Sequence, residues 1–183
     1  MKIVGKLLLK LMGWKIVGDF PKEIKKSITV FAPHTSTWDA IIGKIYLVAI
    51  GLKYNVMVKQ ELFNFPLGII MRLVRAIPID RSKGSNVTFQ VANIIESKEE
   101  VHILLFPEGT RAKVDNWKKG FYLMAKRAEV PIVVGYLDYK KKEIGMKGVI
   151  HDLSNIKVVM SKLNEYYQGI EAKHPERFVL EQI

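Results

Sequence analysis

The two residues best suited to proton transfer are His34 and Asp39, which stand five positions apart in the sequence. An imidazole can remove a proton from a hydroxyl group, and a carboxylate beside it can hold one tautomer and stabilise the imidazolium that forms. The pair follows an apolar run, Ile28 to Ala32, and precedes a stretch with helical spacing. We therefore predict that it lies where a buried strand turns into a helix. Such a spacing alone is a weak signal that needs context.

A second polar stretch, Phe106-Pro107-Glu108-Gly109-Thr110-Arg111, comes at the end of the most apolar run of the chain, residues 101–106. Ligands of open α/β sheets bind outside the carboxyl ends of the strands, so we expect this stretch and His34 to face one crevice. Gly109 allows a tight turn or the close approach of a ligand, and the guanidinium of Arg111 suits a phosphate. The alternative is a capping turn that contains only a Glu–Arg ion pair.

The elements that must position these residues alternate along the chain. Strands are predicted over 27–32, 54–59, 74–79, 101–106 and 131–136, and helices over 37–51, 60–73, 87–97, 118–128 and 154–167. The helix over 60–73 is predicted to be interrupted near Pro66-Leu67-Gly68. Residues 138–143 are predicted to form a charged hairpin tip before a short strand at 144–146. This alternation predicts an α/β fold: a single domain with a largely parallel central sheet flanked by helices, spanning residues 21–183.

The N-terminal segment, residues 1–20, is predicted to carry an amphipathic helix over residues 2–17. Lys2, Lys6 and Lys10 form a basic stripe at four-residue spacing, and apolar residues cover most of the remainder. Such a helix is typical of one that lies in the headgroup plane of a membrane. An ordinary amphipathic helix docked on the domain is the alternative.

Composition also favours a membrane surface. The formal charge is +11, from 29 Lys and Arg against 18 Asp and Glu, which favours an anionic partner. Because 49% of the residues are hydrophobic and no nucleic-acid recognition motif is present, we expect an anionic membrane surface and no nucleic acid. The chain has no cysteine, so disulfides, thiolate metal sites and a cysteine nucleophile are excluded.

We expect attachment to the membrane rather than passage through it. The best candidate span, Ala40 to Leu52, is too short and carries Lys44. The N-terminus lacks the pattern of a secretory signal, because Lys6 and Lys10 interrupt its apolar run. The predicted location is therefore the cytoplasmic face of a membrane, as a peripheral or monotopic protein.

Taken together, the motifs resemble those of the glycerolipid acyltransferase family. The resemblance covers residues 27–136 and rests on His34, Ser36 and Asp39, and on residues 106–111, where all six positions of a specific motif match. Ile79-Asp80-Arg81 is similar to the end of a further family motif, and Val130-Pro131-Ile132-Val133 is similar to the last one.

Departures from the family pattern lie in three of these motifs. Pro33 stands where the family usually has Asn, and Arg75 and Pro78 stand at Gly and Phe positions of the second motif. The usual second proline of the last motif is absent. The proposed catalytic groups are present, so the departures concern the identity of the acceptor rather than the reaction.

The resemblance implies transfer of a fatty acyl group from a thioester, acyl-CoA or acyl carrier protein, to the hydroxyl of a lysophospholipid. The acceptor it implies is 1-acyl-glycerol-3-phosphate, in phospholipid biosynthesis. His34 would be the general base and Asp39 its orienting partner, and no metal or other cofactor is needed. The implied substrate-binding residues are Lys59, Arg81, Glu108, Gly109, Thr110 and Arg111. Independently of the family, a phosphate needs converging cations, and Lys59, Arg81 and Arg111 lie at predicted strand ends.

Two other activities remain open at this point. The acceptor could be a lyso-aminolipid such as lyso-ornithine lipid, or water could attack the thioester and make the protein a hydrolase. Ser36 is expected to cap the helix rather than act as a nucleophile, and N–H groups at the start of that helix are expected to stabilise the oxyanion. The apolar residues Phe63 to Met71 could line an acyl groove, dip into a bilayer or pack in the core, and Lys83, Gly84 and Ser85 could assist phosphate binding.

Overall fold

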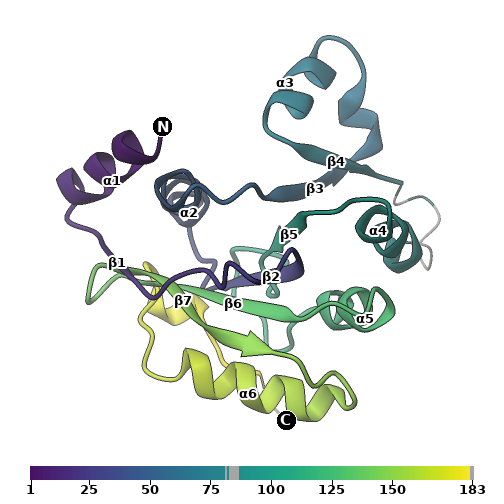
Figure 1. The fold of residues 1–183 in the computed structure, drawn as a ribbon. Helices are drawn as coiled ribbons and strands as arrows, with labels where there is room; N and C mark the ends of the chain where they lie inside the picture. The colour runs from purple at the N-terminus through teal and green to yellow at the C-terminus, as the bar shows by residue number, and fades with distance from the viewer. Residues whose placement is uncertain (81, 83–86, 182–183) are drawn as a thin grey trace.

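The computed structural model describes residues 1–80, 82 and 87–181, which form a central sheet with helices on both faces (Figure 1). Among these residues the sheet has seven strands in the order β1-β7-β6-β2-β5-β3-β4. All neighbouring pairs are parallel except β6 and β7, so the predicted largely parallel α/β sheet is confirmed. The strands are β1 (Lys15–Val17), β2 (Lys26–Ala32), β3 (Asn55–Lys59), β4 (Ala76–Ile79), β5 (Val101–Leu105), β6 (Ile132–Asp138) and β7 (Glu143–Ile150).

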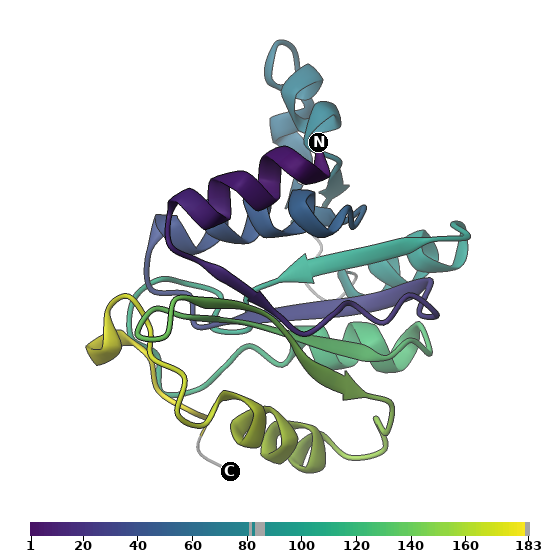
Figure 2. The same ribbon diagram turned by 60° about the vertical axis from the view of Figure 1, so that its left-hand side comes forward.

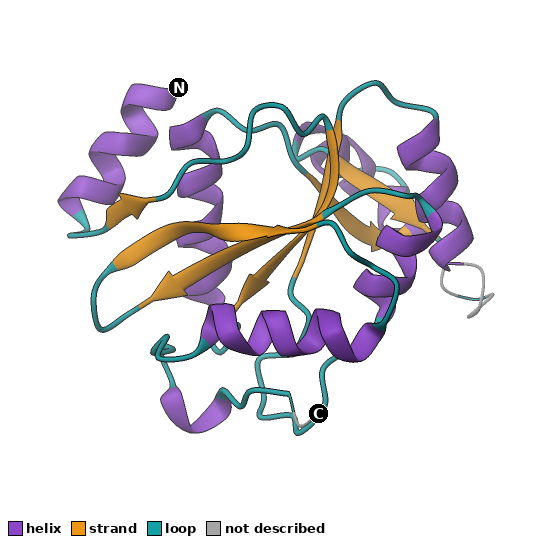
Figure 3. Cartoon of the chain, turned by 60° about the horizontal axis from the view of Figure 1, so that its bottom comes forward, coloured by secondary structure: helices purple, strands orange, loops and turns teal. Residues whose placement is uncertain are grey.

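Helices cover the sheet in two layers. Helix α2 packs on one face with α1, and α4, α5 and α6 pack on the other, where Figure 3 shows α6 crossing the sheet. The helices are α1 (Lys2–Leu11), α2 (Thr37–Ile50), α3 (Leu67–Leu73), α4 (Val87–Glu96), α5 (Gly120–Arg127) and α6 (Ile156–Tyr167), with short 3-10 turns η1 (Gln60–Phe63) and η3 (Pro175–Arg177).

Strand β2 shows why the sheet is buried on both sides. Ile28 and Val30 belong to the core shared with α4, α5 and α6, whereas Phe31 contacts Tyr46 of α2 with ring centroids 6.2 Å apart. Side chains alternate between the two faces of a strand, and both faces of a parallel sheet are covered by crossover helices. A continuous apolar run, rather than an alternating one, is the expected sequence for such a strand.

The predicted N-terminal helix over residues 2–17 is too long. Helix α1 ends at Leu11 because Gly13 takes a φ of +77°, a left-handed conformation that ends helices. The chain then runs extended, and β1 pairs in parallel with β7. Helix α1 packs closely on α2, since a Cβ added to Gly5 would lie 2.7 Å from the backbone nitrogen of Ala49.

Two other elements differ from the prediction. The helix expected over 60–73 is divided into η1 and α3, with the break near Pro66 that the sequence indicated. Strand β7 is longer than the expected 144–146, because it forms a full antiparallel hairpin with β6.

None of the helices in the described part of the chain is long and apolar enough to cross a bilayer.

Strands β3 and β5 separate toward their carboxyl ends. They pair only at Asn55 with Ile103 and at Val56 with Leu104, whereas β3 continues along β4 as far as Lys59 and Ile79. The η1–α3 stretch between β3 and β4 stands out from the body of the molecule in two views (Figures 1 and 2). The sheet therefore opens between β3 and β5 at the edge where ligands of this fold class bind.

Candidate active site

The turn from β2 into α2 brings His34 and Asp39 together. Ser36 is the N-cap of α2: its Oγ accepts from the N–H of Trp38 at 3.3 Å, and its own N–H donates to Oδ2 of Asp39 at 2.7 Å. This capping box folds Asp39 back against the turn. Its Oδ2 then lies 3.4 Å from Nδ1 of His34, longer than an ordinary N–H···O hydrogen bond. The prediction that Ser36 caps the helix is confirmed.

Asp39 is fully buried and held through both carboxylate oxygens. Oδ2 accepts from the N–H groups of Thr35 and Ser36, at 2.6 and 2.7 Å, and Oδ1 accepts from the hydroxyl of Tyr139 at 2.6 Å. Burial raises the pKa of Asp39, but the contacts with His34, Tyr139 and the two N–H groups outweigh burial and hold that pKa below its usual value. Asp39 is therefore an anion at neutral pH, which is what an imidazolium partner requires.

The same contacts change one expectation about the oxyanion. The N–H groups of Thr35 and Ser36 donate to Asp39, and that of Trp38 donates to Ser36, so these donors at the start of α2 are already engaged. Among the described residues the N–H of Thr37 has no hydrogen-bond partner. Its own side-chain Oγ1 accepts from Nη1 of Arg111.

Tyr139 is a site residue that sequence reasoning missed. It follows β6 directly, and β6 lies beside β2 on the side opposite to β5. Burial, then the hydrogen bond to Asp39 and its charge, raise the pKa of Tyr139, so the hydroxyl keeps its proton and acts as a donor. Its position just past a predicted parallel strand is a signal for a site residue. The charged sequence of residues 138–143 instead predicted a solvated hairpin tip.

Strand β5 brings Phe106 and Glu108 against His34. The rings of His34 and Phe106 are stacked, with centroids 3.8 Å apart and planes 12° apart, and the N–H of His34 donates to Oε1 of Glu108 at 2.7 Å. The two motifs meet because β2 and β5 are parallel neighbours with aligned ends. Glu108 and Arg111 do not pair with each other, so the expected alternative of a Glu–Arg ion pair does not hold.

Glu108 is buried beneath this turn, with 3% of its surface exposed. Burial raises its pKa to about 7; the N–H of His34 and its own N–H act in the opposite direction, and the charge of Asp39 adds to the rise. Its Oε2 has no partner within the described part of the chain. Glu108 thus gains or loses a proton close to neutral pH, and the expected contact with substrate stays a prediction.

A cavity of about 720 Å³ opens beside His34 where β3 and β5 separate. Gly109, Thr110 and Arg111 line it, and Gly109 has a φ of +69° with Lys118 packed against it, so a side chain at this position would be strained. The remaining lining is mostly apolar and comprises Val56, Met57, Leu104, Leu105, Phe106, Pro107, Gly120, Phe121 and Met124, with Lys118 as a second cation. His34, with Asp39 behind it, therefore faces an apolar cavity that also holds a guanidinium.

Comparison with known proteins places the chain in a family. A family model described as Acyltransferase matches residues 17–136. The chain belongs to the acyltransferase family. It is 26% identical over 137 residues to a 1-acyl-sn-glycerol-3-phosphate acyltransferase of Cocos nucifera, covering 72% of this chain and 44% of that relative.

A solved structure supports the fold of this chain. The 1-acyl-sn-glycerophosphate acyltransferase PlsC of Thermotoga maritima matches with a TM-score of 0.62 and 16% identity, over 90% of this chain and 73% of that one. The chain thus spans less than half the length of the Cocos nucifera relative, but most of the length of the solved neighbour.

The other binding residues predicted from the sequence are placed less completely. Lys59 is exposed at the carboxyl end of β3, two residues beyond Met57, and is not part of the cavity wall. Thr110 lines the cavity, and its Oγ1 accepts from the N–H of Ala112 at 3.3 Å. Arg81 lies outside the described residues, as do Lys83, Gly84 and Ser85. Among the residues that are described, no three His, Asp or Glu side chains gather closely enough to hold a metal ion.

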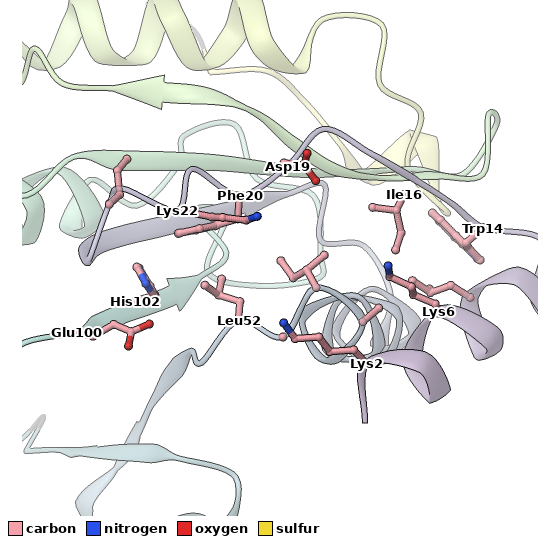
Figure 4. A pocket seen from close by; sticks show the side chains of 15 residues that line it. Lys2, Lys6, Trp14, Ile16, Asp19, Phe20, Lys22, Leu52, Glu100 and His102 are labelled. Atoms are coloured by element: carbon pink, nitrogen blue, oxygen red, sulfur yellow. The ribbon is translucent and has the colours of Figure 1, made fainter.

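A second cavity, of about 740 Å³, lies beside the first residues of β5 (Figure 4). His102 lines it, buried to 1% exposure, with Nδ1 hydrogen-bonded to Oγ of Ser27 at 2.9 Å and its ring edge-to-face with Phe20. Burial lowers the pKa of His102, although the charge of Glu100 opposes this. This histidine therefore stays neutral, at the opposite edge of the sheet from His34.

Proposed function

We propose that this chain transfers a fatty acyl group from a thioester to the hydroxyl of a lysophospholipid, with 1-acyl-glycerol-3-phosphate as the acceptor. The observation that carries the proposal is the His34–Asp39 pair at the mouth of an apolar cavity that also presents Arg111. The names of the Cocos nucifera relative and the Thermotoga maritima neighbour support the choice of acceptor.

In this proposal His34 acts as general base and then as general acid. Because Nδ1 faces Asp39, we assign the proton to Nδ1 and leave Nε2 to accept the proton of the acceptor hydroxyl. The hydroxyl oxygen attacks the thioester carbonyl, the C–S bond breaks, and the imidazolium returns the proton to the departing thiolate. Asp39, anionic in its buried position, stabilises the imidazolium between the two steps.

The charge that develops on the carbonyl oxygen needs a donor other than the engaged N–H groups of α2. We assign this role to the N–H of Thr37 and to the guanidinium of Arg111, which donates to the Thr37 side chain. Both lie at the amino end of α2, where the helix dipole is positive.

The cavity gives each part of the substrates a place. We assign the acyl chain to its apolar wall between β3 and β5, where Val56, Met57 and Leu105 lie. We assign the acceptor phosphate to the cationic rim, which includes Arg111 and Lys118. Lys59 and Arg81 remain candidates from the sequence for the same phosphate.

We also propose that the protein lies on the cytoplasmic face of an anionic membrane. Two segments expose most of the large apolar side chains, and Figures 1 and 2 place α1 and α3 on the same side of the sheet. Core packing does not explain the second segment, since Phe65 is 87% exposed. The exposed residues are Ile3, Val4, Leu7, Leu8 and Leu11 in α1, and Leu62, Phe65, Leu67, Ile69, Ile70 and Leu73 around α3. Basic residues that flank such surfaces favour anionic lipids.

A transfer assay tests the proposal. Purified protein is given labelled acyl-CoA or labelled acyl carrier protein, with lysophosphatidic acid, other lysophospholipids, lyso-ornithine lipid or no acceptor. We expect phosphatidic acid as the main product, and a rate that falls by about 10²–10⁴-fold in His34→Ala but not in the matched control His102→Ala. Acylation of lyso-ornithine lipid alone would name a different acceptor, free fatty acid formed without any acceptor would indicate a hydrolase, and unchanged turnover by a folded His34→Ala would refute the assigned base.

A further inference from the structure

Tyr139 is fixed at three points around the catalytic pair. Its hydroxyl donates to Asp39, its ring contacts Trp14, and its N–H donates to the carbonyl of Glu171 at 2.8 Å. We propose that Tyr139 is a positioning residue for acyl transfer, and that Trp14 holds it in place, which makes the N-terminal segment part of the catalytic apparatus. This inference rests on the proposed roles of His34 and Asp39.

The hydroxyl contact sets the orientation of the Asp39 carboxylate. Oδ2 accepts the two N–H groups and faces His34, and only Oδ1 is left to fix the rotation of the carboxylate plane. Oδ1 lies 2.6 Å from the Tyr139 hydroxyl. The Nδ1–Oδ2 distance of 3.4 Å is already long, so a small rotation of this carboxylate would misalign the His34 ring while its negative charge stays beside the ring.

Trp14 positions the ring of Tyr139. The two rings meet edge-to-face with centroids 5.0 Å apart and planes at 86°, and Nζ of Lys142 lies 5.3 Å from the Trp14 ring and 5.8 Å from the Tyr139 ring. Trp14 is itself buried, and its backbone N–H donates to the carbonyl of Leu9, in the last turn of α1, at 2.8 Å. The position of α1 is thus connected to Asp39 through two aromatic side chains.

Loss of the Tyr139 hydroxyl has an electrostatic consequence as well as a geometric one. The Asp39 carboxylate would carry a less dispersed charge, which favours the protonated form of the imidazole beside it. The other charged groups nearby are Glu108 beneath the His34 backbone, Arg111 at Thr37, and Lys142 over the Tyr139 ring. None of these loses its contact when Tyr139 is replaced by Phe.

The test compares Tyr139→Phe with Tyr46→Phe, which removes a second buried tyrosine hydroxyl, one that has no hydrogen-bond partner among the described residues. Assays use detergent micelles and a water-soluble short-chain acceptor, so that membrane attachment does not enter. We expect Tyr139→Phe to lower kcat about tenfold and to change KM less than about twofold, while the acid limb of the rate profile moves to higher pH. Tyr46→Phe should match the wild type.

Trp14 gives an independent arm of the same test. We expect Trp14→Ala to lower kcat about threefold with the same shift of the pH profile, and Trp14→Phe to restore both, since a benzene ring retains the edge-to-face contact. A purely structural role would lower the melting temperature without moving the pH profile.

An NMR titration of the His34 ring separates failure of this inference from failure of the proposed function. If the wild type transfers no acyl group, the proposed function is wrong, yet a higher titration midpoint in Tyr139→Phe would still support the positioning role. A Tyr139→Phe protein with wild-type kcat, rate profile and His34 titration would overturn the inference.

Discussion

Two histidines on neighbouring strands occupy opposite edges of one sheet. His34 follows β2 at the carboxyl edge, and His102 lies near the start of β5 at the amino edge. Each lines a cavity, of about 720 and about 740 Å³ respectively, and each has a polar side chain beside Nδ1. Cavity size and a polar neighbour therefore do not distinguish the two sites.

The chemical difference lies in the partners. Asp39 is held as an anion by donors on both of its oxygens, and its Oδ2 lies 3.4 Å from Nδ1 of His34. Ser27 offers His102 only a neutral hydroxyl, which is shared with Thr29, and burial disfavours the charged form of the ring. Of these two histidines, His34 is the one with a carboxylate partner, at the carboxyl edge where a strand runs into a capped helix.

The largest loss of activity is expected when Asp39 is made neutral, as Ser27, the partner of His102, already is. Asp39→Asn removes the charge but keeps the size of the side chain, so transfer should fall by about 10²–10⁴-fold. The measurement is kcat at neutral pH, with the exposed Asp152→Asn as the matched control. Activity within fivefold of the wild type would mean that the charge of Asp39 is not what separates the two histidines.

The local part of this contrast was predictable from the sequence. The separation of Ser36 and Asp39 is that of a capping box, so geometry that involves only neighbouring residues places the carboxylate beside the histidine turn. Strand and helix alternation likewise predicted a parallel sheet whose strand ends meet, and therefore a site shared with residues 106–111.

The contacts that cross the sheet were not predictable in the same way. Tyr139 reaches Asp39 from the end of β6, and Glu108 reaches the N–H of His34 from the end of β5. Such pairs depend on strand order and register, which hydrophobic periodicity does not specify. The length of α1 was missed for another reason: the apolar pattern continues past Gly13 into β1, and an apolar run does not by itself separate helix from strand.

Glu108 is a buried carboxyl beside His34, and among the described residues no buried carboxyl lines the cavity beside His102. Its pKa is about 7 in the folded protein against an ordinary 4.5, so the folded state binds the proton more tightly and is most favoured below pH 4.5. That contribution is lost as pH rises through 7, and the shift corresponds to about 3 kcal/mol. Urea unfolding at pH 5 and pH 8 should show this loss in the wild type and a flatter dependence in Glu108→Gln. Equal slopes in the two proteins would contradict it.

His102→Ala should change stability and leave the chemistry intact. The variant loses the edge-to-face contact with Phe20 and the hydrogen bond to Ser27, so the free energy of unfolding should fall by about 2 kcal/mol. Acyl transfer at saturating substrate should stay within about twofold of the wild type, measured below the melting temperature of the variant. Loss of kcat in a variant that is still folded would give the amino edge a role in the reaction and weaken the contrast with His34.

The smallest effect is expected for Ser27→Ala. This substitution tests whether Ser27 and His102, which are hydrogen-bonded at the amino edge of the sheet, act as a catalytic serine–histidine dyad. The Ser27 hydroxyl is fully buried and hydrogen-bonded to both Thr29 and His102, so it cannot reach a substrate without opening the sheet. The substitution should cost about 1 kcal/mol of unfolding free energy, because it leaves the His102 nitrogen without its partner. Thioesterase and transferase rates should both be unchanged. A serine-reactive fluorophosphonate probe should likewise label wild type and Ser27→Ala equally, whereas labelling lost only in Ser27→Ala would make Ser27 a nucleophile.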